Sequence, residues 1–283
     1  MNPTTAAVRA GWTRGLIELR QSYTNGADLF GHLFWPTVLL VVVYFTRHTT
    51  VESGGLVLGA LVLPSVLGMN IALNGLLTMS QLLTVEREDG TLLRAKATPN
   101  GMLGYLVGKI VTVAGGLVID LAIVLVPGMF IINGLEYGRP SSWLTLAWVV
   151  VLGLVATLPL GAIFGSLISS SRSLGLIMLP IMGMIAISGI FYPITAMPQW
   201  LQWVAQVFPI YWLGLGVRSA LLPDSAAVVE LGESWRHLET VAVLGAWAVL
   251  GLVVAPVVLR RMARRESGSS VAARRDKVMQ RVG

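Results

Sequence analysis

Long apolar runs separated by short polar stretches dominate the chain, and six of these runs have the length of a membrane span. A helix needs about 20 mostly apolar residues to cross roughly 30 Å of hydrocarbon. The predicted spans cover Leu29–Phe45, Leu56–Leu77, Ile110–Ile132, Leu144–Ile168, Leu174–Ile194 and Val241–Leu259. We therefore expect an all-α integral membrane protein with six transmembrane helices in a domain of residues 29–259.

A further apolar stretch, between the fifth and sixth spans, is interrupted by prolines. Short pieces bounded by proline do not cross a bilayer but re-enter it or lie at its surface. The residues that mark this outer segment are Pro193, Pro198, Trp200, Trp203, Pro209 and Tyr211. The pattern predicts re-entrant helices, although the same aromatic residues are also typical of a belt at the membrane surface.

Residues 1–28 have a different pattern, which predicts an amphipathic helix. A helix over residues 8–23 gathers its large apolar side chains on one stripe, with arginines beside it. The stripe consists of Val8, Trp12, Leu16, Leu19 and Tyr23, and the arginines are Arg9 and Arg20. Such a helix either lies in the membrane interface or packs on the cytoplasmic side of the bundle. This segment lacks the apolar core of a signal peptide, so we expect the first span to be retained.

Positive charge predicts the orientation of the spans. Of the 20 lysine and arginine residues, 16 lie in the N-terminal segment, residues 84–109, the loop around Arg172 and the basic tail of residues 260–283. The other four are Arg47, Arg139, Arg218 and Arg236. Cytoplasmic loops carry the excess of such charge, so we expect both termini in the cytoplasm and the tail near anionic lipid.

The composition excludes several other classes of protein. Hydrophobic residues make up 55% of the 283 residues and charged residues 12%, which leaves too little polar surface for a soluble enzyme, a disordered chain or a nucleic-acid-binding domain. There is no cysteine and there are three histidines, so we expect neither disulfides nor a metal site. The positive-inside pattern accounts for the sequence pI of about 10.1 without a nucleic-acid partner.

The loop between the second and third spans carries the densest cluster of charge. Glu86, Arg87, Glu88 and Asp89 end the second helix, and Gly90 breaks it. A short helix is expected next, with Thr91 as its cap and Lys96 as its last residue. It contains Leu92, Leu93 and Arg94. After it, Thr98-Pro99 predicts a turn. A second short helix is expected over residues 102–107. The loop is either a docking element for another protein or a solvated anchor that fixes orientation.

Three polar residues inside the spans are candidates for a transport path. Asp120 lies near the centre of the third span, where a carboxylate costs several kcal/mol unless it faces a wet cavity or a hydrogen-bond partner. Asn70 and Asn74 are four residues apart and share one face of the second span. Each can line a path or form hydrogen bonds between helices.

Two motifs resemble the ABC-2 type permease family, in particular its drug-export branch with the daunorubicin-resistance permeases. The first comprises Glu86-Arg87-Glu88, Gly90-Thr91-Leu92, Thr98-Pro99 and Gly108-Lys109. The second comprises residues 188–193, Met197-Pro198-Gln199-Trp200-Leu201, Phe208-Pro209 and Tyr211. Members often have Glu after Gly-Thr-Leu, where this chain has Leu93.

The resemblance implies the fold, the partners and the function. It implies a permease subunit of an ATP-driven exporter in a bacterial cytoplasmic membrane, acting as a homodimer with a separate ATPase. The substrate would be hydrophobic or amphiphilic, such as a drug or antibiotic, with lipid or polymer export as an alternative. The loop with Glu86, Arg87 and Glu88 would couple the chain to the ATPase.

The residues themselves give no ATP site. Gly104 to Lys109 comes nearest to a phosphate-binding loop, but it has one residue too few between its glycines and no following Ser or Thr. We therefore expect ATP and Mg²⁺ to bind the partner ATPase, and this chain to be no enzyme. A membrane enzyme acting on lipids lacks a catalytic constellation here, and an ion-coupled secondary transporter has Asp120 as its only support.

Overall fold

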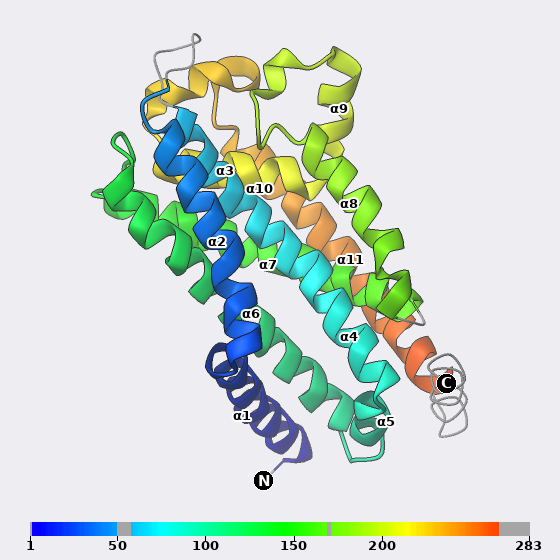
Figure 1. Ribbon diagram of the computed structural model, residues 1–283. Helices are drawn as coiled ribbons and strands as arrows, with labels where there is room; N and C mark the ends of the chain where they lie inside the picture. Colours follow the sequence, from blue (N-terminus) through cyan, green and yellow to red (C-terminus); the bar gives the residue numbers. More distant parts are fainter. Residues whose placement is uncertain (1, 50–57, 169–170, 266–283) are drawn as a thin grey trace.

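The computed structural model describes residues 2–49, 58–168 and 171–265, and every regular element in them is a helix (Figure 1). The α-helices are α1 (Pro3–Thr24), α2 (Gly26–Thr46), α3 (Leu58–Leu73), α4 (Met79–Glu88), α5 (Thr91–Lys96), α6 (Gly101–Ile131), α7 (Pro140–Leu167), α8 (Gly175–Ile187), α9 (Gln199–Val207), α10 (Pro209–Leu221) and α11 (His237–Arg265). A π-helical turn, η1 (Asn74–Thr78), joins α3 to α4, and four 3-10 turns are η2 (Ser171–Leu174), η3 (Ile194–Ala196), η4 (Asp224–Val229) and η5 (Leu231–Glu233).

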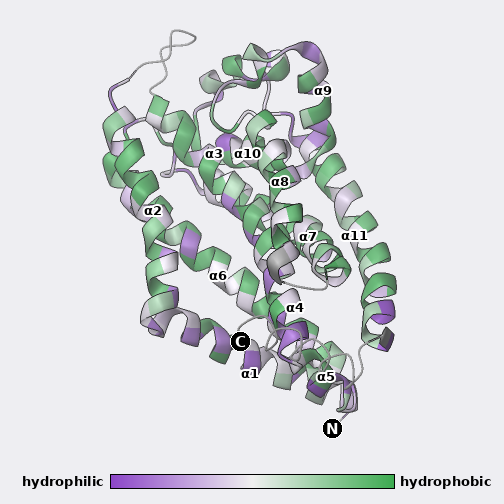
Figure 2. Ribbon diagram, turned by 45° about the vertical axis from the view of Figure 1, so that its right-hand side comes forward, coloured by the Kyte–Doolittle hydropathy of each residue, from purple (hydrophilic) through white to green (hydrophobic). Residues whose placement is uncertain are grey.

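Five helices among the described residues are long and apolar enough to cross a membrane. They are α2, the continuous helix Leu58–Glu88 formed by α3, η1 and α4, then α6, α7 and α11. Each corresponds to one of the six predicted spans; residues 56 and 57 of the second span lie outside the described residues. Figure 2 shows hydrophobic residues along these helices and hydrophilic ones gathered along α1 and around α5.

The remaining predicted span corresponds to α8, which has 13 residues and is therefore only about 20 Å long. The apolar run continues to Ile194, but the backbone turns away at Gly189, whose φ is +71°. The Ser188 hydroxyl also donates to the carbonyl oxygen of Ile185 at the end of the helix. A left-handed glycine thus ends the helix before the apolar sequence ends.

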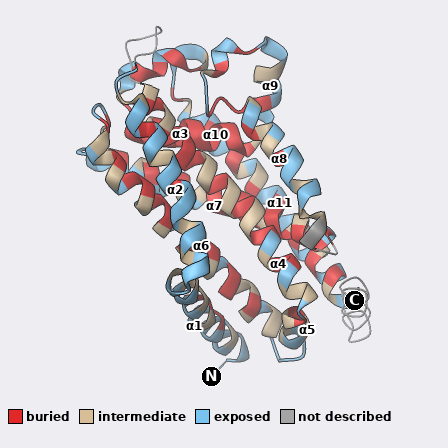
Figure 3. Cartoon of the chain, viewed as in Figure 1, coloured by how far each residue is buried: buried red, intermediate tan, exposed pale blue. Residues whose placement is uncertain are grey.

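The core of the bundle lies where α3 packs against α10 and α7 packs against α10 and α11. Figure 3 shows that buried residues concentrate in α3 and α10, while α2 and α8 present exposed residues. α10 is buried along most of its length, although neither its 13 residues nor its sequence mark it as a span. The exposed apolar residues of α2, such as Trp35 and Phe45, are what a lipid-facing helix carries.

The helices at the α5 end of the bundle extend beyond the predicted boundaries. α6 begins at Gly101 and runs unbroken to Ile131, so the expected separate helix over residues 102–107 is its first part. α1 and α2 are separated by Asn25 alone, whose side chain accepts a hydrogen bond from the backbone N–H of Ala27. α1, α5 and the end of α11 lie at the same end (Figure 1), where Lys96 donates to the carbonyl oxygen of Ala263.

Candidate functional site

Three helices at this end meet in a cluster of charged residues, which we call the charge cluster: Glu18, Glu86 and Lys109. Lys109 Nζ lies 2.5 Å from Glu18 Oε2 of α1 and 2.5 Å from Glu86 Oε1 of α4. The Lys109 side chain is 2% exposed, the Glu86 side chain 13% and the Glu18 side chain 23%. One buried ammonium therefore joins α1, α4 and α6, and two carboxylates compensate its charge.

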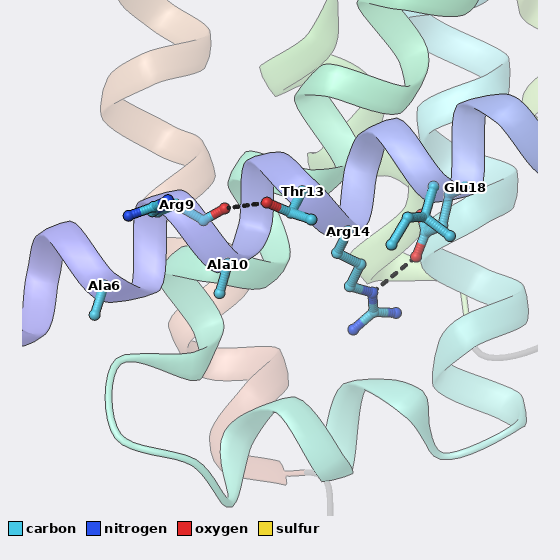
Figure 4. A pocket seen from close by; sticks show the side chains of 7 residues that line it. Ala6, Arg9, Ala10, Thr13, Arg14 and Glu18 are labelled. Carbon is cyan, nitrogen blue, oxygen red and sulfur yellow. Dashed lines mark hydrogen bonds and ion pairs between the residues drawn. The ribbon is translucent and has the colours of Figure 1, made fainter.

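Arg14 brings a second positive charge to the charge cluster from α1. Its Nε lies 2.8 Å from Glu18 Oε1, and its Nη2 lies 3.8 Å from Glu86 Oε1. Figure 4 marks the ion pair between Arg14 and Glu18 with a dashed line. Burial alone would raise the pKa of Glu18, but hydrogen bonds from Lys109 and Arg14 outweigh it and hold this pKa below its ordinary value. Glu18 is therefore ionised at neutral pH, and the cluster together with Arg14 brings four charged groups into contact.

Glycines allow α1 to approach α6 beside the charge cluster. A Cβ atom at Gly11 would lie 2.2 Å from the carbonyl oxygen of Gly104, and one at Gly15 would lie 2.6 Å from that of Gly108. Two pairs of glycines four residues apart thus face each other across the helix crossing. The exposed face of α1 carries Trp12 and Leu16, so α1 packs on the bundle with one face and leaves an apolar face for the predicted interface.

The predicted short helix after Gly90 is confirmed, and its bounds are Thr91–Lys96. Gly90 has a φ of +80°, a conformation that glycine adopts without strain. The predicted cap is wrong in detail, because Thr91 is already the first helical residue and Gly90 occupies the N-cap. The backbone N–H of Thr91 donates instead to Asp89 Oδ1 at 2.7 Å, so the carboxylate of Asp89 satisfies the N–H that lacks a helical partner.

The remaining predicted loop residues separate into an inner and an outer group. Arg87 Nη1 donates to the carbonyl oxygens of Ile168 (3.0 Å) and Ser166 (3.3 Å) at the end of α7. Leu92 is buried, and Glu88 and Leu93 are half-buried. These residues attach the loop to the helix bundle.

The outer group forms the tip of the loop, which we define as Arg94, Thr98 and Pro99. All three are exposed. Arg94 donates to the hydroxyl of Thr91, and Thr98 donates to the carbonyl oxygen of Ala95. The tip is therefore a surface of fixed shape at the end of the molecule.

Asn70 and Asn74 lie on one face of the second span, as predicted. Asn74 Nδ2 donates to the carbonyl oxygen of Asn70 at 3.2 Å, and both residues are half-buried. Asn74 also begins the π-helical turn η1; single turns of this kind are frequent at functional sites. The opposite face packs closely on α7, where a Cβ atom at Gly161 would lie 2.1 Å from the carbonyl oxygen of Gly75.

Asp120 has partners that the sequence did not indicate. Its Oδ1 accepts a hydrogen bond from the hydroxyl of Tyr23 at 2.7 Å and lies 3.0 Å from Nδ1 of His32. Nε2 of His32 lies 2.8 Å from the hydroxyl of Ser22, and the Tyr23 and His32 rings stack. His32 is about 9 Å from the start of α2, so this network joins the end of α1 to the beginning of the first span.

The predicted outer segment forms α9, α10 and the turns around them. Trp200 and Trp203 of α9 are exposed, at 62% and 64%, whereas Tyr211 of α10 is fully buried. Pro198 caps α9, and Pro209 is the first residue of α10. Pro193, half-buried, precedes the turn η3. The aromatic residues of this segment thus divide between a surface helix and a core helix.

A family model for an ABC-2 family transporter protein matches residues 37–257. The chain belongs to the ABC-2 transporter family. ABC-2 proteins are the membrane components of ABC transporters, and this member is a multi-pass membrane protein. No curated protein compared with the chain matches it.

Within the charge cluster of this ABC-2 chain, the sequence did not single out Glu18, and it marked Lys109 only as part of the Gly108-Lys109 motif. Glu18 is the only acidic residue before Asp28, and Lys109 is the only charged residue between Lys96 and Asp120. Lys109 is an isolated charge in an apolar context, which is the signal that could have marked it, whereas Glu18 lies between Arg14 and Arg20 of the amphipathic segment. Their pairing with Glu86 depends on the packing of three helices.

Proposed function

We propose that the chain is the permease subunit of an ATP-driven exporter and that it works as a homodimer with a separate ABC ATPase. In this proposal it lies in a bacterial cytoplasmic membrane with both termini in the cytoplasm. It moves a hydrophobic or amphiphilic substrate, such as a drug or antibiotic, out of the cell. Lipid or lipid-linked polymer export fits the same architecture and is the alternative substrate class.

The observation that carries the proposal is the tip at the end of α5. The tip belongs to the loop that connects two membrane helices, because α5 follows α4 and precedes α6. The charge cluster joins those same helices to α1, and Arg87 joins α4 to α7. A force applied to the tip by an ATPase therefore reaches four helices through direct contacts, which is the requirement for coupling hydrolysis to a tilt of the spans.

Six crossings with re-entrant outer helices are part of the proposal. α8 begins near α4, through the turn η2, and ends beside α9 at the opposite end of the bundle (Figure 1). Its 13 residues and the adjoining turns together connect the two ends. An even number of crossings agrees with the position of α1 and of the end of α11 at the same end.

A second copy of the chain would complete the transport path. Asn70 and Asn74 remain half-buried in the single chain, and Gln81 further along the helix is exposed. Uncovered amides facing lipid are unfavourable, so this face is better suited to a wet path between two copies. In this proposal Asp120 stabilises the junction of α1, α2 and α6, because its carboxylate has two partners from the first two helices.

ATP and Mg²⁺ are bound by the partner in this proposal. Gly104 and Gly108, the nearest approach to a phosphate-binding loop, lie inside α6 and pack against α1. Their N–H groups belong to a continuous helix, so the segment has another structural use.

A single cysteine at the tip tests the proposal, because the chain has no cysteine of its own. A Thr98→Cys variant, expressed in its native host and treated with a bifunctional thiol cross-linker in membranes, should cross-link to an ABC ATPase that mass spectrometry identifies. A Trp200→Cys variant, at the opposite end, should not. Labelling of the Thr98→Cys variant by an impermeant maleimide from outside intact cells would contradict the orientation, and an equal yield of the ATPase from both variants would contradict the docking site.

A further inference from the structure

A small cavity lies at the end of the bundle opposite the tip. It has a volume of about 130 Å³ and is bounded by the start of α3, the turn after α8, the end of α10 and η4. Its apolar lining includes Leu61, Ile190 and Phe191. Drug-sized sites measure roughly 300–1,000 Å³, so this cavity suits a head group of a few heavy atoms rather than a whole drug or lipid.

Two opposite charges form part of the cavity lining although both are buried. Arg218 of α10 is 3% exposed and Glu230 is 5% exposed, and Arg218 Nε lies 2.6 Å from Glu230 Oε1. Arg218 Nη1 donates to the hydroxyl of Ser65 at 3.0 Å and to the carbonyl oxygen of Gly189 at 3.5 Å. The sequence had assigned Arg218 to a loop outside the membrane, whereas the structure places it inside a core helix.

Stability alone does not require this pair. Replacing a buried ion pair by apolar residues of similar volume is often neutral or stabilising, and the surrounding helices are strongly apolar. Ionisable residues inside a membrane protein therefore mark a functional site by default, especially where they meet a cavity. The guanidinium has five N–H donors, and the bonds given above engage only Nε and Nη1.

We propose that this cavity binds the anionic head group, a phosphate or carboxylate, of an amphiphile with an alkyl chain. Arg218 donates hydrogen bonds to the head group, while the hydroxyl of Ser65, which itself donates to the carbonyl oxygen of Leu61 at 2.7 Å, accepts from Arg218 and holds the guanidinium in place. The alkyl chain leaves the cavity along Phe191 and Tyr192, which are 53% and 45% exposed and line its mouth. Arginine matches the geometry of both kinds of anion.

Glu230 sets the strength of this binding. Its carboxylate competes with the ligand anion for Arg218, so the site binds reversibly and releases its ligand when the ion pair forms again. Neutralising Glu230 leaves Arg218 free for the ligand and removes a repulsive charge. The site depends only on residues of this chain, so the inference goes beyond the proposed function and holds with or without an ATPase.

Binding of dodecyl phosphate to the full chain in phosphatidylcholine nanodiscs tests the proposal, with titration calorimetry as the readout and empty nanodiscs as the blank. We expect Glu230→Gln to tighten binding at least 10-fold. We expect the double variant Arg218→Gln/Glu230→Gln to weaken it at least 10-fold relative to the unmodified chain. This double variant leaves no unpaired buried charge, and size-exclusion chromatography checks that it folds.

The unmodified chain supplies a test that does not depend on any variant. Dodecyl phosphate should bind at least 10-fold more tightly than dodecyltrimethylammonium or dodecyl maltoside, because only the phosphate complements Arg218. Inorganic phosphate should bind more weakly than dodecyl phosphate, since it lacks the alkyl chain that contacts Phe191. Equal affinity for the three amphiphiles, or tighter binding of inorganic phosphate, would overturn the proposal, as would unchanged affinity in the folded double variant.

Discussion

Lys109 lies within an apolar helix, and its ammonium group lies 2.5 Å from the carboxylate of Glu86 at the end of the helix before the α5 loop. The pair holds the two helices that flank the loop at a fixed separation. Glu18 of α1 adds a second carboxylate at the same distance from Lys109. The loop is therefore attached to the bundle by buried charges, and its exposed tip is a separate surface.

Lys109→Met should destabilise the chain by about 3 kcal/mol, because it removes the buried cation and leaves Glu18 and Glu86 to share the half-exposed Arg14. Thermal unfolding in detergent measures this change. The matched control is Arg139→Ala, since Arg139 forms an ion pair with Glu136 at 2.6 Å but is 63% exposed. That change should cost at most about 1 kcal/mol. Equal losses in the two variants would mean that Lys109 is not buried with its partners.

The stability of the chain should fall in acid because of Glu18. Its pKa in the folded chain lies below the ordinary value of 4.5, so its contribution is present above about pH 4.5 and is lost as the pH falls through the lowered folded value. The midpoint of thermal unfolding should therefore fall more steeply with decreasing pH in the unmodified chain than in Glu18→Gln. Parallel curves would contradict the ion pairs of Glu18.

Gly11→Ala should loosen the crossing of α1 and α6. The added Cβ would lie 2.2 Å from the carbonyl oxygen of Gly104, so the helices must move apart at a cost of about 1–3 kcal/mol. Gly31→Ala in α2 is the control, because a Cβ there meets nothing within 4 Å. Faster proteolysis of the N-terminal helix in Gly11→Ala, and not in the control, is the expected result; equal rates in both would argue against the close crossing.

Asp120→Asn should assemble normally and keep its pH profile in an export assay. The amide oxygen of asparagine can still accept hydrogen bonds from Tyr23 and His32, so the junction of the three helices persists. Asp120→Leu removes the carboxylate that Tyr23 and His32 share and leaves the hydroxyl of Tyr23 with the carbonyl oxygen of Gly116 at 3.1 Å. The loss of hydrogen bonds to a charged group should cost about 1.5–3 kcal/mol in thermal unfolding. A shifted pH profile in the asparagine variant would instead indicate that Asp120 carries a proton during transport.

The sequence predicts those features that depend on neighbouring residues. Apolar runs locate the five long helices, and Gly90 and Pro99 bound the short helix between α4 and α6. Hydrophobic periodicity does not predict where the backbone turns within an apolar run. The predicted span ended at Ile194, whereas α8 ends at Ile187, just before Gly189.

The residues next to each charged group in the sequence do not predict the polar contacts of the candidate site. Glu18 is 91 residues from Lys109, and His32 is 88 residues from Asp120. Lys109 resembles a loop charge in the sequence because its carboxylate partners belong to other helices. Arg218 likewise resembles a charged residue of a loop, because the segments that bury it are far apart in the sequence.

The most direct test of the proposed coupling is ATP hydrolysis by an ABC ATPase in complex with the chain. The complex captured through the tip would be reconstituted in nanodiscs, and its ATPase activity compared with that of a variant carrying Arg94→Ala and Pro99→Ala. These residues are exposed at the tip, so the variant should keep the stability of the chain. We expect it to lose ATPase binding or at least 10-fold of the stimulated activity, while Glu136→Ala, at the other end of the bundle, retains both. Normal binding and full activity in the tip variant would contradict the assignment of this loop as the coupling element.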